Sequence, residues 1–195
     1  SEVAIPDRDP VQTGTWKKDS KGWWYQYSDN TYAKNEIVTV NGVEYAFGAN
    51  GYVVNGWYLD NGAYYYSTTS GLKRGWVQSG ASWYYMDPST GKMATGFVDI
   101  KGVTYYMNAS GAMLTGWFQI GGKWYYTAAT GVVAKKGWVG NYYLDKDGVM
   151  VTYAYVKNGA KYYWINSAGV YTQTYTEKDT VGYVIYDQAT GARMN

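Results

Sequence analysis

The sequence predicts an all-β solenoid of about eight stacked β-hairpin repeats, each roughly 20 residues long. Three observations lead to this fold class. Similar motifs recur at intervals of 19 to 21 residues and begin at Trp16, Ile37, Trp57, Trp76, Phe97, Trp117 and Trp138. Runs of Trp, Tyr and Val that suit strands are separated by Gly-containing dipeptides that suit tight turns. No segment shows helical periodicity. A hairpin of this size cannot bury its apolar face alone, so each repeat must stack on its neighbours.

The repeat is clearest where residues 76–85, WVQSGASWYY, are compared with residues 117–126, WFQIGGKWYY. Unit seven is shortened before Tyr142, and an eighth unit is expected to begin at Ala154. Residues 187–191 repeat the turn composition of residues 87–91, so a partial capping repeat closes the chain. Residues 1–14 lack the pattern and are predicted to be a linker or tail. Residues 15–195 then form the repeat domain.

Composition excludes several functional classes. The 25 Tyr and 10 Trp, against 3 Phe, indicate a core built from aromatic rings. The net charge of +2 gives no general attraction to nucleic acid. The chain has no His and no Cys, which removes the commonest general base and the thiolate ligands of metals. We therefore predict a protein that is not an enzyme, with no catalytic residue, metal site or cofactor. No apolar run is long enough for membrane insertion.

Residues 75–96 carry Gly-Trp, Trp-Tyr-Tyr, Asp, Gly-x-Met and Gly in one order and spacing. This unit resembles the choline-binding and cell-wall-binding repeats of bacterial surface proteins, which are related to glucan-binding repeats. The likeness extends over about residues 15–173. It implies a left-handed superhelix of hairpins, with ligand held between consecutive hairpins by two aromatic rings of one repeat and one of the next. It further implies a secreted protein attached to the bacterial cell surface.

The family pattern places the first two rings at the lead Trp and at the Trp seven residues later. Three pairs keep this spacing, and a Tyr of the following hairpin would supply the third ring of each site. Successive strand residues point to opposite faces, so only one Tyr of each adjacent pair can face the ligand. The resulting sites are Trp16, Trp23 and Tyr45; Trp76, Trp83 and either Tyr105 or Tyr106; and Trp117, Trp124 and either Tyr142 or Tyr143.

Two ligand classes suit such rings. A quaternary ammonium such as teichoic-acid choline has no hydrogen-bond donor and is attracted to aromatic faces. A glucan or another wall polysaccharide can stack on the same faces and bond to polar turn residues. A third alternative is a structural or adhesive spacer, because several second-position Trp are replaced, for example by Glu44 and Thr104. The residues from Tyr183 to Tyr186 are interpreted as a cap or as the contact of a homodimer through the C-terminal hairpin.

Overall fold

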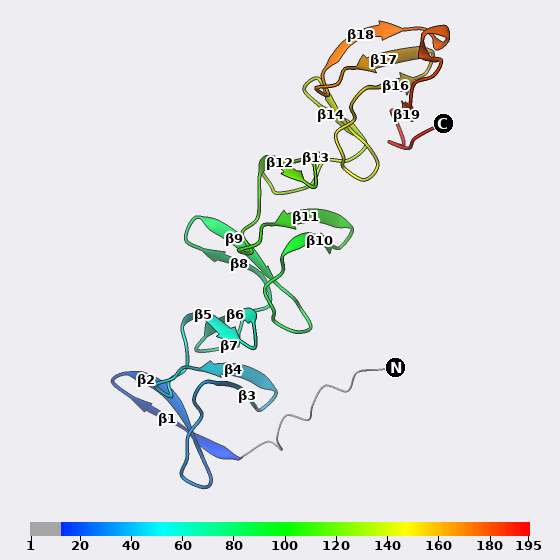
Figure 1. Ribbon diagram of the computed structural model, residues 1–195. Helices are drawn as coiled ribbons and strands as arrows, with labels where there is room; N and C mark the ends of the chain where they lie inside the picture. Colours follow the sequence, from blue (N-terminus) through cyan, green and yellow to red (C-terminus); the bar gives the residue numbers. More distant parts are fainter. Residues whose placement is uncertain (1–12) are drawn as a thin grey trace. The chain divides into compact units, whose positions relative to one another are not determined.

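The computed structural model describes residues 13–195, which form a succession of short antiparallel hairpins (Figure 1). Residues 1–12, which make up most of the predicted tail, lie outside this range. The chain is divided into two compact units, one ending at Ala94 and the other comprising Thr95–Asn195. Within the described range the only helical element is the short 3₁₀ helix η1 (Glu177–Thr180). The predicted all-β class built from hairpin repeats is therefore confirmed.

The first unit contains four hairpins whose strands are joined by two-residue turns. In two of these turns the dipeptides Asn41-Gly42 and Asn61-Gly62 have positive φ at both residues, as tight hairpin turns require. The strands are β1 (Gly14–Asp19), β2 (Gly22–Tyr27), β3 (Glu36–Val40), β4 (Val43–Phe47), β5 (Gly56–Asp60), β6 (Ala63–Thr68), β7 (Gly71–Leu72), β8 (Gly75–Ser79) and β9 (Ser82–Met86).

The second unit also contains four hairpins, and the last is extended into a four-stranded sheet of order β18-β17-β16-β19. In that sheet β19 runs parallel to β16, whereas the other pairs are antiparallel. The strands are β10 (Gly96–Ile100), β11 (Val103–Met107), β12 (Gly116–Ile120), β13 (Lys123–Thr127), β14 (Gly137–Val139), β15 (Tyr142–Leu144), β16 (Ala154–Asn158), β17 (Lys161–Ile165), β18 (Tyr171–Tyr175) and β19 (Ile185–Asp187).

Strand register corrects the expected start of the eighth repeat. In most hairpins a Gly pairs with the last residue of the second strand and directly precedes the lead aromatic residue, as at Gly116 and Trp117. Ala154 occupies the Gly position, because it pairs with the last residue of β17, and it is almost fully buried. Tyr155 therefore takes the lead position that the sequence analysis gave to Ala154. The prediction that Ala154 is the lead residue was therefore wrong, because Ala154 replaces the Gly that usually precedes the lead residue.

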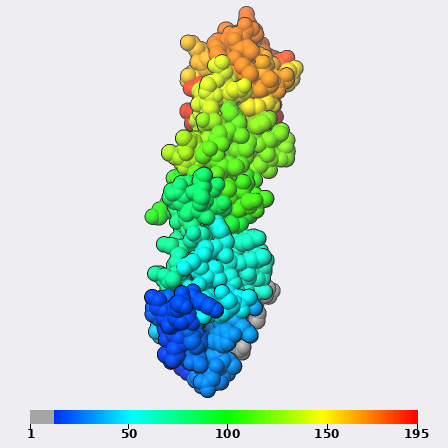
Figure 2. Space-filling view, turned by 90° about the vertical axis from the view of Figure 1, so that its left-hand side faces the viewer, coloured from blue at the N-terminus to red at the C-terminus, as the bar shows by residue number. Residues whose placement is uncertain are grey.

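Consecutive hairpins are joined by a recurring backbone hydrogen bond. The residue at the second aromatic position of one hairpin, seven residues after the lead residue in complete hairpins, uses its backbone carbonyl as the acceptor. The donor is the backbone amide of a residue that follows the next hairpin. The pairs are Val53 to Trp23, Met93 to Tyr64, Val133 to Thr104, Met150 to Trp124 and Tyr171 to Asn141, all at 2.8 Å between N and O. We call this set the inter-hairpin ladder. Neighbouring repeats of each unit accordingly cover neighbouring patches of the surface, as the colour order shows (Figure 2).

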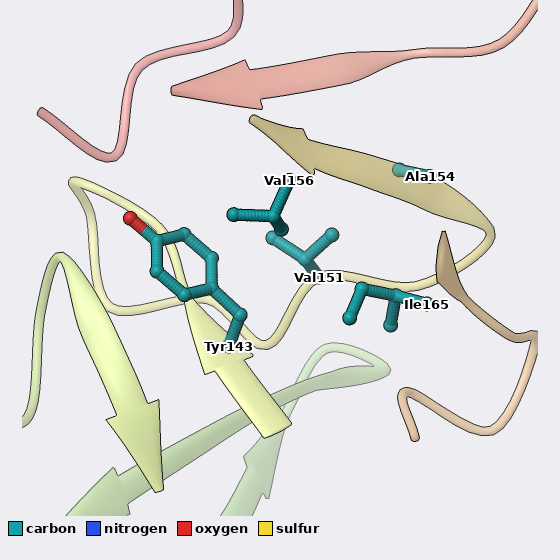
Figure 3. Packing of buried hydrophobic residues seen from close by; sticks show 5 residues of the cluster. All are labelled: Tyr143, Val151, Ala154, Val156 and Ile165. Carbon is teal, nitrogen blue, oxygen red and sulfur yellow. The ribbon is translucent and has the colours of Figure 1, made fainter. Parts of the chain in front are cut away.

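Aromatic rings, Met and Val form the core of each unit. In the first unit Tyr25, Ala33, Val40 and Phe47 form one buried cluster, on which Trp16 packs. In the second unit Tyr143 lies among four buried aliphatic residues at the start of the last sheet, Val151, Ala154, Val156 and Ile165 (Figure 3). The predicted contribution of aromatic rings and Val to the core is confirmed by these two clusters, but Ala or Ile side chains also belong to each of them.

The end of the chain packs on the last sheet of its own unit. The ring of Tyr183 lies 5.1 Å from that of Trp164 and 5.6 Å from that of Tyr155. The turn after β19 is closed as the sequence suggested, because the amides of Gly91 and Gly191 both donate to the carbonyl of the Asp four residues earlier. The segment thus covers the sheet, while the homodimer through it stays a prediction.

Candidate functional site: aromatic rings between consecutive hairpins

The first hairpin junction brings together all three rings that the sequence selected there. The Trp16 ring centroid lies 6.2 Å from that of Trp23, with nearly perpendicular planes, and 4.8 Å from that of Tyr45 on the next hairpin. Trp16 also packs on Tyr25 and Phe47, so its position is set by the core. Trp23 keeps 39% of its surface exposed. We call this arrangement of Trp16, Trp23 and Tyr45 an aromatic corner. The core fixes the Trp16 ring, and the Trp23 ring is accessible to solvent.

A lysine is part of this corner. Lys18 is the cross-strand neighbour of Trp23, and its Nζ lies 5.2 Å from the centroid of the Trp23 ring. An ammonium at that distance is within cation–π range. The same register position holds a neutral side chain in two other hairpins, where Gln78 is opposite Trp83 and Gln119 is opposite Trp124. The first site therefore already contains a cation of its own.

A second junction, in which two of the selected rings meet, lies between β12–β13 and β14–β15. The Trp117 ring centroid lies 5.0 Å from that of Tyr142 on the next hairpin. Trp117 and Trp124 keep 37% and 41% of their surfaces exposed. Their exposure leaves aromatic faces available to a ligand in solution.

Tyr142 and Tyr143 have different environments, which separates the two alternatives left by the sequence. Tyr143 is fully buried, and its hydroxyl donates to the backbone carbonyls of Asp187 and Gln188. Burial raises the pKa of Tyr143 to about 12, and the nearby Asp187 charge acts in the same direction. Tyr142, on the opposite strand face, is the ring that reaches Trp117.

The remaining predicted set is divided between the two units. Trp76 and Trp83 belong to the first unit, where their ring centroids are 6.3 Å apart at 86°, and Trp83 is 41% exposed. Tyr105 and Tyr106 belong to the second unit, where Tyr106 stacks on Phe118 at 4.7 Å. Tyr105 pairs with the middle residue of its partner strand, as Tyr45 does in the first unit. This site stays a prediction.

A further junction of the same kind was missed by the sequence analysis. The ring centroids of Trp57 and Tyr84 are 4.7 Å apart, and Tyr64, which replaces the second Trp, is 46% exposed. The indole of Trp57 donates to the Ser79 hydroxyl at 3.2 Å. The requirement for Trp at the second position excluded this set. The signal that could have found it is a Tyr eight residues after the lead residue of the next repeat.

The first hairpin also carries an acidic aromatic pocket on the strand face opposite Trp23. It has a volume of about 250 Å³ and is lined by Asp19, Trp24, Tyr32, Asn50, Gly51 and Tyr52. The Tyr52 hydroxyl donates to Asp19 at 2.8 Å, and this bond is the main cause that lowers the pKa of the Asp19 carboxyl. These residues were not predicted as a site, because they come from the first hairpin with the segment that follows it and from the segment after β4, which are far apart in the chain.

Acidic, His and Cys side chains do not gather into a metal-binding cluster of three or more anywhere in residues 13–195. No helix in the same range has the length and apolar character needed to cross a membrane.

Comparison with known proteins identifies the kind of repeat that part of this chain matches. The family model described as "Choline-binding repeat" matches residues 94–138, and that described as "Putative cell wall binding repeat" matches residues 75–93. Residues 75–138 thus match repeats of the choline-binding and cell-wall-binding kind. The resemblance inferred from the sequence is confirmed, and the matched repeats contain Trp76, Trp83, Trp117 and Trp124.

Solved structures with choline-binding repeats have the same fold. Choline-binding protein F from Streptococcus pneumoniae superposes with a TM-score of 0.68 at 28% identity, covering 81% of this chain and 57% of the other. CbpJ of the same species gives a TM-score of 0.68 at 28% identity, covering 80% of this chain and 57% of the other. A lysozyme of Streptococcus phage Cp-9 is 41% identical over 37 residues, which are 19% of this chain and 11% of that protein. The chain thus spans little more than half the length of the solved relatives.

Proposed function

We propose that this chain is a non-catalytic module that binds teichoic-acid choline in aromatic corners between consecutive hairpins, and so holds a secreted protein at the bacterial cell surface. The observation that carries the proposal is the recurring junction geometry. At Trp16 and at Trp117, the lead ring lies 4.8 and 5.0 Å from a Tyr ring of the next hairpin. Each of these two hairpins also carries an exposed Trp at its second position, Trp23 or Trp124.

The chemistry of these corners suits a methylated ammonium. Such a cation donates no hydrogen bond, so polar groups have nothing to offer it, whereas each ring face contributes roughly 0.5–2 kcal/mol. Three rings then give an affinity on the order of millimolar for one site. Several sites in one chain bind a choline-bearing polymer much more tightly, because the second contact forms at high effective concentration.

The relatives support the same assignment at the level of the wall. Choline-binding protein F has been crystallised in the presence of a peptidoglycan analogue, a tetrasaccharide-pentapeptide. The phage lysozyme shares one short segment with this chain. A wall-binding module joined to other functional parts fits both findings, and it fits the choline-binding repeats found here.

The test is a titration of intrinsic tryptophan fluorescence with choline up to tens of millimolar. The matched control ligand is 3,3-dimethyl-1-butanol, in which carbon replaces the charged nitrogen at nearly the same shape. We expect a saturable response to choline, a much weaker one to the alcohol, and a reduced choline response in Trp117→Ala. Val181→Ala, which alters a side chain that is 81% exposed and outside the junctions, is the control variant.

Attachment to the envelope is tested separately with purified cell walls. Walls that carry choline should retain the protein, and free choline should release it. Equal responses to choline and to the neutral alcohol would contradict the cation-binding proposal. A response only to an α-glucan oligosaccharide series would instead assign the module to the glucan-binding class.

A further inference from the structure

The junction between the shortened hairpin β14–β15 and the last sheet holds a pocket of a different chemical character. Its volume is about 340 Å³, near the lower end of the range of about 300–1,000 Å³ found for small-molecule sites. Three aromatic rings and three amide side chains contribute to it. The lining residues are Trp138, Gly140, Asn141, Asn158, Tyr163, Tyr171 and Gln188.

The shortened hairpin explains why this junction differs from the others. Trp138 pairs with Tyr143, only five residues later, whereas Trp117 pairs with Tyr126, nine residues later. The turn at Gly140-Asn141 therefore occupies the place where the longer hairpins continue. The ladder shows the substitution directly, because the Asn141 carbonyl accepts from the Tyr171 amide just as the Trp124 carbonyl accepts from Met150. Asn141 thus stands at the position of the second Trp.

The rings of this pocket come from three strands. Trp138 is the lead residue of its hairpin, and Tyr163 has the strand register that Tyr45 has in the first unit. Tyr171, from β18, is a ring that the complete junctions lack. The centroid distances are 5.7 Å for Trp138–Tyr163, 5.9 Å for Trp138–Tyr171 and 5.4 Å for Tyr163–Tyr171, with planes 71–82° apart.

The polar side chains around the rings are all neutral amides. The Trp138 indole donates to Gln188 Oε1 at 3.1 Å, which fixes the indole plane and occupies one acceptor of Gln188. Asn141 and Asn158 are both exposed, and they bring donors and acceptors to the pocket from two different turns. None of the seven lining residues carries a formal charge.

From this composition we infer that the pocket binds a neutral sugar residue. Amides can donate to and accept from hydroxyl groups, while the flat Trp138 and Tyr faces offer an apolar surface to the C–H groups of a pyranose ring. A quaternary ammonium has no N–H donor for the amide oxygens, so the amides would contribute little to binding it. The chain would then recognise choline at its aromatic corners and a sugar at this one junction.

The experiment uses the full chain labelled with 5-fluorotryptophan, in which Trp138→Phe identifies the ¹⁹F resonance of residue 138. Choline is present at saturating concentration so that the aromatic corners are filled. Methyl α-glucopyranoside and N,N′-diacetylchitobiose are the two probes, since the first represents a glucan and the second an amino-sugar wall glycan. We expect one of them to shift the Trp138 resonance saturably.

The variant Asn141→Ala/Asn158→Ala should weaken the response to that sugar about 10-fold, since two hydrogen bonds are removed. Asn55→Ala, an exposed Asn in the first unit, is the matched control and should leave the affinity unchanged. A retained ¹⁹F spectrum shows that the variants are folded. No shift with either sugar, or equal affinity in the double variant, would overturn the inference. The Trp16 and Trp117 resonances report separately whether choline binds.

Discussion

Trp124→Leu is the most informative single change at the candidate corner of β12–β13. The ring of Trp124 is 41% exposed, so its face is available to a ligand, and its backbone carbonyl accepts the ladder bond from Met150. Leucine keeps an apolar side chain and that carbonyl but has no aromatic face. Removing one cation–π contact of about 1 kcal/mol weakens choline binding about 5-fold, within a range of about 2- to 30-fold.

The assay is again the ¹⁹F spectrum of the chain with all 10 Trp labelled, because each resonance reports its own site during a choline titration. The apparent dissociation constant read at Trp117 should rise by the factor given above. The constant read at Trp16, in the other unit, should not change and serves as the internal control. If Trp117 reports the same choline affinity with and without the Trp124 ring, the assignment of Trp124 to the site is refuted.

Three further changes test other features. Lys18→Gln should increase choline affinity at Trp23 about 2- to 5-fold, because it removes an ammonium that shares the ring; an unchanged ¹⁹F titration at Trp23 would contradict this. Stability should fall as pH rises from about 10 to 12, because the Tyr143 pKa is raised to about 12 and the unfolded chain loses this proton first; Tyr143→Phe should show a shallower fall in alkaline urea unfolding. Gly191→Ala should lower thermal stability more than Gly80→Ala. Both residues have positive φ, but an added Cβ would lie 2.5 Å from the Lys146 backbone nitrogen at Gly191 and would meet nothing at Gly80. Equal losses in melting temperature would refute the steric argument.

Repeat spacing and turn composition were sufficient to predict the hairpins. Asn-Gly and Gly-Gly dipeptides permit the positive φ of tight turns, and the lead aromatic residues recur because each repeat must cover its neighbour. Unit eight was misaligned by one residue, because Ala154 replaces the Gly that precedes the lead aromatic residue in most other hairpins. Because Gly and Ala are both small, this replacement does not alter the spacing of Trp and Tyr from which the repeats were aligned.

The site was less predictable than the fold. Seven-residue spacing selects pairs within one hairpin, but the choice between Tyr142 and Tyr143 depends on strand faces and on burial under the chain end. The position of Lys18 over Trp23 depends on cross-strand register, which no single-strand pattern contains. The pocket lined by Trp138 and the three amides exists because hairpin β14–β15 is shortened. Its third ring, Tyr171, comes from β18, which is not part of a repeat hairpin.

The inter-hairpin ladder also determines how such a chain responds to force. Within each unit, one hairpin is tied to the next by ring contacts, a ladder bond such as Val53 to Trp23, and a few side-chain bonds such as Trp57 to Ser79. A pull along the chain can break these ties in sequence instead of all at once. Each released repeat of about 20 residues would lengthen the tether by roughly 70 Å at most. If the chain serves as the proposed wall anchor, the attached protein can yield to flow while its remaining repeats stay bound.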